Sequence, residues 1–225
     1  MGLSICPGEF LMVLGRSGCG KSTLLNIMGG TIAPTEGEVT VGGQMVNGPD
    51  ASRILLTQQP TLLPWLTVFE NVAFGLRVRK ETKGLEERVN EALALVRLEG
   101  HREYLPSQLS VGMQQRVCMA RAMVGKPSLL MMDEPFGSLD ALTRAHLQAE
   151  VIKIRQESPE TTLVFVTHDI EEALLLGSRL VVLGGDPGRI VADYPLTQAY
   201  PRNAADPELL RLKETIMNHF REEAS

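Results

Sequence analysis

Four continuous apolar runs divide the chain, and each predicts a strand that is buried on both faces. They cover residues Phe10–Leu14, Leu129–Met132, Leu163–Val166 and Leu180–Leu183. A strand with one solvent-facing side alternates apolar and polar residues, whereas a strand covered on both sides is apolar throughout. The segments between the runs are patterned as helices. The sequence therefore predicts an α/β fold in which helices cover a parallel sheet.

Outside these runs the pattern changes twice. Glu38–Val41 and Gln44–Val46 flank a Gly-Gly pair, which predicts a small antiparallel hairpin. From Val68 to about Val124 the pattern is helical, with no convincing strand. Leu209, Leu212, Ile216 and Phe220 predict a further amphipathic helix after Asp206-Pro207.

These patterns suggest one domain over residues 1–225, divided into three parts. Residues 1–66 and 126–200 form the core with its β portion. Residues 67–125 form an inserted helical subdomain, and residues 201–225 carry the C-terminal helix.

Composition narrows the classes of function. The net charge of −5 gives no indication of a nucleic-acid binder. Three widely spaced cysteines, Cys6, Cys19 and Cys118, favour a reduced compartment without disulfides or zinc. No apolar run approaches the length of a membrane span, and Met1–Cys6 does not read as a signal peptide. We expect a soluble protein that reaches a membrane only through a partner.

A glycine-rich motif follows the first apolar run and precedes a predicted helix over Leu24–Met28. It comprises Gly15, Arg16, Ser17, Gly18, Cys19, Gly20, Lys21, Ser22 and Thr23. In G-x-x-x-x-G-K-[ST], backbone N–H groups and the helix N-terminus surround an anion. Lys21 reaches the β- and γ-phosphates, and the Ser22 hydroxyl can bind Mg²⁺. The motif predicts a nucleoside triphosphate site; the alternative is a glycine-rich turn with a solvated lysine.

Two acids end the second apolar run. Asp133 suits indirect coordination of Mg²⁺, and Glu134 is placed to polarise a water that attacks the γ-phosphate. The alternative is an acidic strand end that meets solvent or caps the next helix.

Leu109–Gln115 opens a predicted helix, and here the chain resembles the ATP-binding subunits of ABC transporters. Taken alone, Ser110 reads as an ordinary N-cap. The family's signature is Leu-Ser-Gly-Gly-Gln or a close variant, before an Asp-Glu strand. The resemblance implies an α/β P-loop NTPase (RecA-like) core with a small antiparallel β portion and an inserted helical subdomain. It also implies that Ser110, Gly112 and Gln114 contact ATP held by a second subunit.

The remaining landmarks of that family also have counterparts. Gln58 resembles the glutamine that contacts Mg²⁺ and the attacking water, and His168 resembles the switch histidine at the γ-phosphate. Ser138-Leu139-Asp140 resembles the loop that crosses to the partner subunit. The resemblance implies Glu134, His168, Gln58 and Lys21 as catalytic residues, with Ser22, Gln58 and Asp133 at Mg²⁺. The alternatives are a solvated loop amide for Gln58 and a helix N-cap for Asp140.

The chain departs from the family pattern in two places. The family carries about two further strands before the Pro7-Gly8-Glu9 turn, with an aromatic residue that stacks on adenine. We expect loss of such a stack to cost about 1–3 kcal/mol of nucleotide affinity. Val111 stands where the signature has its first glycine, and a β-branched side chain restricts the backbone and crowds the phosphate. We expect a weakened composite site.

Three stretches resemble importers for nitrate, sulfonate, taurine or bicarbonate: Leu62–Val72, Gly185–Ile190 and Pro201-Arg202. Within the first, Pro64-Trp65-Leu66 reads either as packing or as a groove for a coupling helix. The resemblance implies a homodimer or a paralogous ATPase partner, integral membrane permease subunits and, indirectly, a substrate-binding protein. The place implied is the cytoplasmic face of the membrane. Alternatives are a soluble ABC ATPase acting on DNA or ribosomes, and a catalytically weak regulatory subunit.

Overall fold

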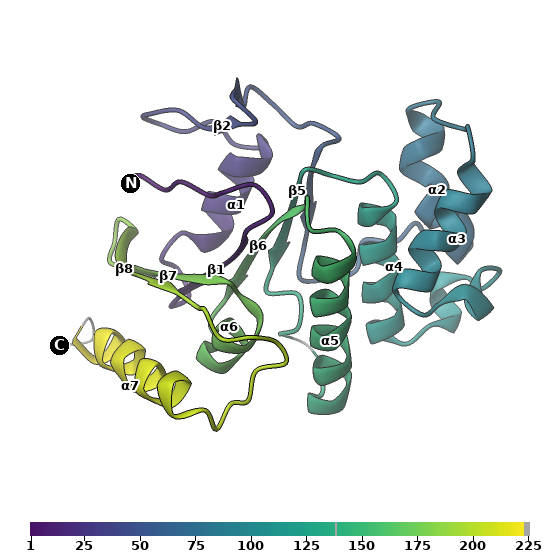
Figure 1. Cartoon of the computed structure of the whole chain (residues 1–225). Coiled ribbons are helices and arrows are strands. Elements are labelled where there is room, and N and C mark those ends of the chain that lie inside the picture. Colours follow the sequence, from purple (N-terminus) through teal and green to yellow (C-terminus); the bar gives the residue numbers. More distant parts are fainter. Residues whose placement is uncertain (138, 223–225) are drawn as a thin grey trace. The chain divides into compact units, whose positions relative to one another are not determined.

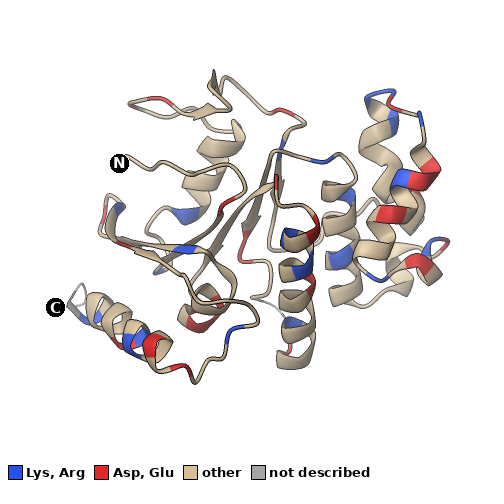
Figure 2. Cartoon of the chain, viewed as in Figure 1, with Lys and Arg blue, Asp and Glu red and all other residues tan. Residues whose placement is uncertain are grey.

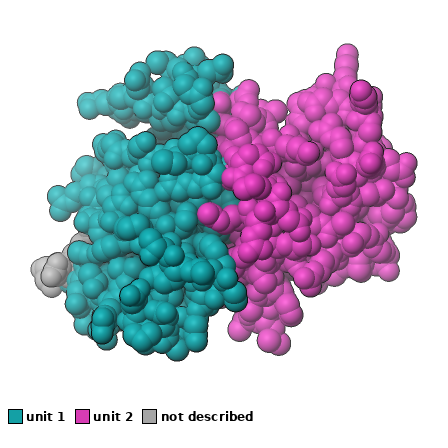
Figure 3. Space-filling model, in the orientation of Figure 1, with its two compact units in different colours: residues 1–49, 131–134, 162–225 teal, residues 50–130, 135–161 magenta. Residues whose placement is uncertain are grey.

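The computed structural model describes residues 1–137 and 139–222 (Figure 1). Ser138, in the stretch that resembles the partner-crossing loop, lies outside the described residues. The chain forms two compact units (Figure 3). Unit 1 contains residues 1–49, 131–134 and 162–225, and unit 2 contains residues 50–130 and 135–161.

Unit 1 is built on a mainly parallel sheet. Its strands are β1 (Phe10–Gly15), the end of β5 (Leu129–Asp133), β6 (Thr162–Thr167), β7 (Arg179–Gly184) and β8 (Arg189–Pro195). They lie in the order β5-β6-β1-β7-β8. β1 pairs in parallel with β6 and β7, and every residue of β1 is buried. All four predicted strands are confirmed.

Helices α1 (Lys21–Gly29) and α6 (Ile170–Leu176) both pack against β1, and in Figure 1 they lie on opposite faces of the sheet. Helix α7 (Pro207–Glu222) packs against α6. The predicted hairpin is also present, as β2 (Thr40–Val41) and β3 (Gln44–Met45). Gly42 and Gly43 have φ of 59° and 76°, which the tight turn between these strands requires.

Unit 2 is mostly helical, as predicted for residues 68–124. It contains α2 (Val68–Val78), α3 (Leu85–Leu95), α4 (Val111–Met123), α5 (Ala141–Glu157) and the short 3₁₀ turns η1 (Glu99–His101) and η2 (Pro106–Gln108). α2, α3 and α4 pack on one another, and α3 and α4 also contact α5. Strand β4 (Arg53–Leu56) was not predicted. It lies beside the start of β5, where the Leu129 N–H donates to the Ser52 carbonyl over 3.0 Å.

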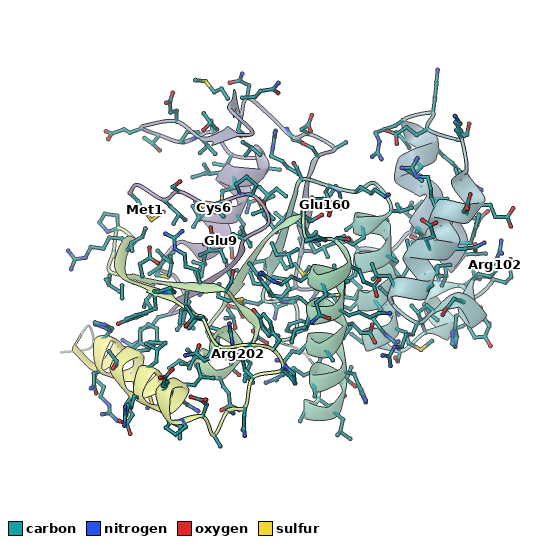
Figure 4. The ribbon with its side chains drawn as sticks, in the orientation of Figure 1. Met1, Cys6, Glu9, Arg102, Glu160 and Arg202 are labelled. Atoms are coloured by element: carbon teal, nitrogen blue, oxygen red, sulfur yellow. The ribbon has the colours of Figure 1, made fainter. Side chains whose placement is uncertain are left out.

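Arg202 belongs to Pro201-Arg202, the last of the three stretches that resemble importers, and it binds carbonyl groups at the C-terminal end of α6. Its guanidinium donates to four backbone carbonyls, those of Leu174, Gly177, Leu196 and Gln198 (Figure 4). It also stacks 4.5 Å above the centre of the Tyr200 ring. The last carbonyls of a helix have no partner within the helix, so this contact satisfies groups that would otherwise lack one.

Arg179 links β7 to β8 and to the segment before β1. It donates to both carboxylate oxygens of Asp193, at 2.8 and 2.6 Å, and to the Ser4 carbonyl at 2.8 Å. It also lies 3.2 Å from the Glu9 carboxylate, which Figure 4 labels. These hydrogen bonds from Arg179 hold the pKa of Asp193 below its usual range.

We expect Asp193→Asn to lower the free energy of unfolding by up to about 1 kcal/mol at pH 7, because the ion pair is partly exposed. A lowered folded-state pKa stabilises the fold above the unfolded-state pKa, near 3.9, and this stabilisation is lost as pH falls through the folded-state value. The difference between variant and wild type in urea unfolding should therefore shrink toward zero in acid. Asp186→Asn, in the same hairpin, is the control. A difference that persists unchanged below pH 3 would contradict this account.

Candidate active site

The start of α1 presents a row of unpaired backbone donors. Gly18 and Gly20 have φ of 89° and 94°, so the chain curls sharply before the helix begins at Lys21. The N–H groups of Gly20, Lys21, Ser22 and Thr23 donate to no acceptor within the described residues. A helix N-terminus with free N–H groups and a positive dipole end favours an anion. This arrangement suits phosphate.

Lys21 is held inside the loop that precedes it. Its ammonium donates to the carbonyls of Gly15 at 2.9 Å and Arg16 at 3.1 Å. The side chain is only 5% exposed and lies 3.8 Å from the Glu134 carboxylate. A buried cation at this point adds positive charge to the donors of α1.

Glu134 lies between two side chains that fix the direction of its carboxylate. One oxygen faces Lys21, and the other lies 2.9 Å from Nδ1 of His168. β5 and β6 are adjacent, and Glu134 and His168 follow their last residues and meet at one edge of the sheet. The Glu134 N–H donates to the Val166 carbonyl over 3.1 Å.

The backbone of Glu134 is strained. Its φ of 44° lies in the left-handed region, which costs a residue other than glycine about 1–3 kcal/mol. Such outliers cluster at functional sites, where the surrounding structure holds them. The conformation points to a role for this carboxylate beyond packing.

Asp133 and Ser22 supply oxygen atoms suited to Mg²⁺. Asp133 ends β5, and its carboxylate has no hydrogen-bond partner among the described residues; Ser22 is exposed in the first turn of α1. The described residues hold no group of three His, Cys, Asp or Glu side chains that could bind a metal alone. Mg²⁺ is typically held by one or two carboxylates together with substrate phosphates and water. These residues therefore fit an ion that arrives with a nucleotide.

The signature-like segment lies in unit 2. Ser110 accepts a hydrogen bond from the Met113 N–H at 3.3 Å and caps α4. The Gln114 amide donates to the carbonyls of Pro106 and Leu109, which folds the preceding loop. Val111 is the first residue of α4 and is 52% exposed. Its backbone is helical, which a β-branched residue adopts readily at a helix start, so the angular restriction expected from valine carries no strain here.

Gly112 has a packing reason to be glycine. A Cβ atom on this residue would lie 2.5 Å from Cγ2 of Thr143 in α5. Real Cβ contacts are essentially never under 3.0 Å. Gly112 is buried, so α4 and α5 approach each other at this position.

Asp140 and Gln58 also belong to unit 2. Asp140 caps α5 by accepting from the N–H groups of Leu142 and Thr143. The hydrogen bond from the Thr143 hydroxyl, and then those from the two N–H groups, hold the pKa of Asp140 below its usual range. The N-cap interpretation of Asp140 is thus confirmed, and its contact with a partner subunit stays a prediction. Gln58 is exposed just after β4.

The predicted site residues whose side chains the structure shows in contact with one another all belong to unit 1. Lys21, Glu134 and His168 are in contact there. No role was predicted for Asn71, whose buried side chain holds the loop before α2. The signal was available, since Asn71 falls at helical spacing from Val68, on the face of α2 that also carries Val72 and Leu76.

A phosphate-binding loop after a buried strand, with a carboxylate between a lysine and a histidine at the same sheet edge, defines a P-loop NTPase. The ABC transporter family matches residues 1–137. The aliphatic sulfonates import ATP-binding protein SsuB of Bacillus subtilis is 43% identical over 218 residues, covering 97% of this chain and 84% of that protein. The taurine import ATP-binding protein TauB of Pelagibacter ubique is 47% identical, covering 92% of this chain and 78% of that protein.

A solved structure of another ABC protein has the same fold. A dimeric ATP-binding cassette, MJ0796, in a post-hydrolysis state bound to ADP and Pi, superposes with a TM-score of 0.73 at 34% identity, covering 88% of this chain and 89% of that one. The chain belongs to the ABC transporter family and is an ATPase. Among the described residues, none of the helices has both the length and the apolar character needed to cross a bilayer.

We expect Gly112→Ala to lower the free energy of unfolding by about 1–3 kcal/mol, because the added methyl overlaps Thr143. Thr143→Ser removes the clashing Cγ2 and keeps the hydroxyl that donates to Asp140. The double variant Gly112→Ala/Thr143→Ser should therefore recover most of the loss in thermal unfolding. Equal stability of single and double variants would mean that packing does not explain this glycine.

Proposed function

We propose that this chain is the ATP-hydrolysing subunit of an ABC importer, and that two copies, or one copy and a paralogue, close around two MgATP. The observation that carries the catalytic part is the Glu134 carboxylate between the Lys21 ammonium and the His168 ring. It lies in the same unit as the free N–H groups of α1.

Nucleotide binding begins at α1. The N–H groups of residues 20–23 receive the phosphates, and Lys21 exchanges its carbonyl partners for the β- and γ-phosphate oxygens. Ser22, Asp133 and Gln58 are the residues that would hold Mg²⁺. When bound with the nucleotide, the ion would neutralise charge that develops on the transferred phosphoryl group.

Hydrolysis uses the carboxylate of Glu134 as general base toward the attacking water. The base must be aimed at that water, and its neighbours fix its direction. The Lys21 ammonium lies 3.8 Å from one carboxylate oxygen of Glu134, and His168 Nδ1 lies 2.9 Å from the other. When a γ-phosphate is present, the other ring nitrogen of His168, Nε2, bonds to it while Nδ1 still orients Glu134, and Gln58 positions the water.

A second subunit supplies the other half of each site. The start of α4 is exposed at Ser110 and Val111, and its first N–H groups, like those of α1, suit an anion. In this mechanism Ser110, Gly112 and Gln114 belong to the half that faces the partner's ATP. The dimeric relative MJ0796, bound to ADP and Pi, supports this arrangement.

The relatives support import of a small sulfonated anion such as taurine or an aliphatic sulfonate; nitrate belongs to the same proposal. Both named relatives are import ATP-binding proteins. Membrane permease subunits would carry the substrate, and a substrate-binding protein would deliver it. The ATPase would act as a peripheral subunit at the cytoplasmic face.

The loop before α2 is suited to hold a permease segment. Trp65 is 72% exposed, yet its loop is rigid, because the buried Asn71 amide bonds to backbone groups of Leu63, Leu66 and Thr67 at 2.9–3.1 Å. An exposed Trp on a fixed loop loses little conformational entropy on binding. We propose that this loop, Leu62–Leu66, is the surface that contacts the coupling helix of the permease.

Two alternatives are less well supported. A role on DNA or ribosomes calls for a basic surface, whereas charges of both signs are mixed along α3, α5 and α7 (Figure 2). A weak regulatory subunit was suggested by Val111, and the unstrained backbone there removes one reason for it.

We expect Glu134→Gln to abolish ATP turnover, with a fall of at least about 100-fold, while ATP binding is retained. The closed dimer should accumulate with MgATP, as measured by light scattering. Glu36→Gln, an exposed glutamate in the same unit, is the matched control. Turnover at the wild-type rate in Glu134→Gln would remove Glu134 from the chemistry.

We expect Trp65→Ala to weaken the affinity for co-expressed permease subunits by at least about tenfold, because an anchor residue is lost. The measurement is the permease concentration that gives half-maximal stimulation of ATP hydrolysis. Leu142→Ala, an equally exposed apolar residue on α5, is the control. Absence of any stimulation in the wild type would favour the regulatory or non-transport alternatives.

A further inference from the structure

The turn between β7 and β8 lies against the phosphate loop. A Cβ atom on Gly188 would be 2.2 Å from the carbonyl oxygen of Cys19, well inside the closest approach of real Cβ atoms. That oxygen belongs to the backbone, which cannot rotate away as a long side chain could. Only glycine therefore allows this turn to rest on the loop as it does.

Cys19 is held from a second side as well. A Cβ on Gly15 would lie 2.6 Å from the Cys19 Sγ and 2.8 Å from the Leu183 carbonyl at the end of β7. The thiol thus fills the space above Gly15, while the carbonyl of the same residue faces Gly188. Both contacts belong to unit 1. Cys19, in the phosphate loop, is therefore packed between Gly15 at the end of β1 and Gly188 in the β7–β8 turn.

The register of the hairpin explains why the turn reaches the loop. Val182 pairs with Ala192, but Leu183 pairs with Ile190, so Val191 is an extra residue on β8. A β-bulge of this kind bends its strand and redirects the neighbouring residues. Beyond the bulge, Leu183 pairs with Ile190 and Gly184 with Arg189, which leaves the four residues 185–188 as the turn.

The contact with Gly188 also sets the direction of a donor. The Cys19–Gly20 peptide is trans, so its carbonyl and the Gly20 N–H point in opposite directions. Because the carbonyl faces the turn, the Gly20 N–H points away from it. That N–H has no acceptor among the described residues, and Gly20 directly precedes α1.

We propose that Gly188 is a positioning residue for nucleotide binding: it holds the Cys19–Gly20 peptide so that the Gly20 N–H is presented to phosphate. The proposal rests on the phosphate-site assignment made under the proposed function. It also gives a role to the Gly185–Ile190 stretch. The turn packs against the phosphate loop at the Cys19 carbonyl, and it need not contact the nucleotide.

The first test is the affinity of Gly188→Ala for MgADP, measured by isothermal titration calorimetry. We expect Kd and the KM for ATP to rise about tenfold or more, since a charge-assisted hydrogen bond to phosphate is misdirected, while kcat changes much less. Gly48→Ala is the matched control, because a Cβ there meets nothing within 4 Å and its φ is not positive. A merely destabilised protein would bind normally below its Tm.

The second test needs no change at Gly188. In the unmodified protein, MgADP should shift the NMR signals of both Gly20 and Gly188, because the peptide that binds phosphate touches the turn, and should leave Gly48 unchanged. This measurement decides the matter if Gly188→Ala fails to fold. An unchanged Gly188 signal in nucleotide-bound protein would overturn the proposal.

Lys21→Ala distinguishes failure of the positioning role from failure of the phosphate site. If Lys21→Ala loses MgADP binding and Gly188→Ala binds as the wild type does, the turn has no positioning role and the phosphate site stands. If Lys21→Ala binds as the wild type does, the assignment of the phosphate site is wrong, and the proposal for Gly188 fails with it.

Discussion

The functional arrangement depends on one electrostatic contact, the carboxylate of Glu134 held between the Lys21 ammonium and the His168 ring. The three residues come from distant parts of the chain, and parallel pairing of β1 with β6, together with the adjacency of β5 and β6, brings their strand ends to one edge. Reversing any of these strands would move one partner to the opposite edge of the sheet. The sheet order is therefore a requirement of the chemistry as well as of the core.

The fold could be predicted where burial is uniform. β1, β5, β6 and β7 are apolar because both of their faces are covered, and each was predicted. β8 was not, because an edge strand carries polar residues such as Arg189 and Asp193. β4 (Arg53–Leu56) begins with an arginine, so its apolar run is only three residues long, shorter than any run from which a strand was predicted.

The residues of the site could be predicted from motifs, but their contacts could not. Nothing within the signature indicates that Gly112 faces Thr143, because that contact depends on how α4 packs against α5. The same holds for Gly188, which lies far from Cys19 in the sequence and meets it in a hairpin that carries a bulge at Val191. Local motifs report the chemistry of a segment, whereas long-range packing decides which atoms meet.

The left-handed backbone at Glu134 sets the thermal stability of the fold against the proposed role of this side chain in ATP hydrolysis. Glycine adopts this conformation without steric penalty, so a chain with glycine at position 134 would be expected to resist heat better than this one does. Under the proposed mechanism it would also lack the carboxylate that activates water. Redesign of this ATPase for stability alone would therefore tend to remove the proposed general base at position 134.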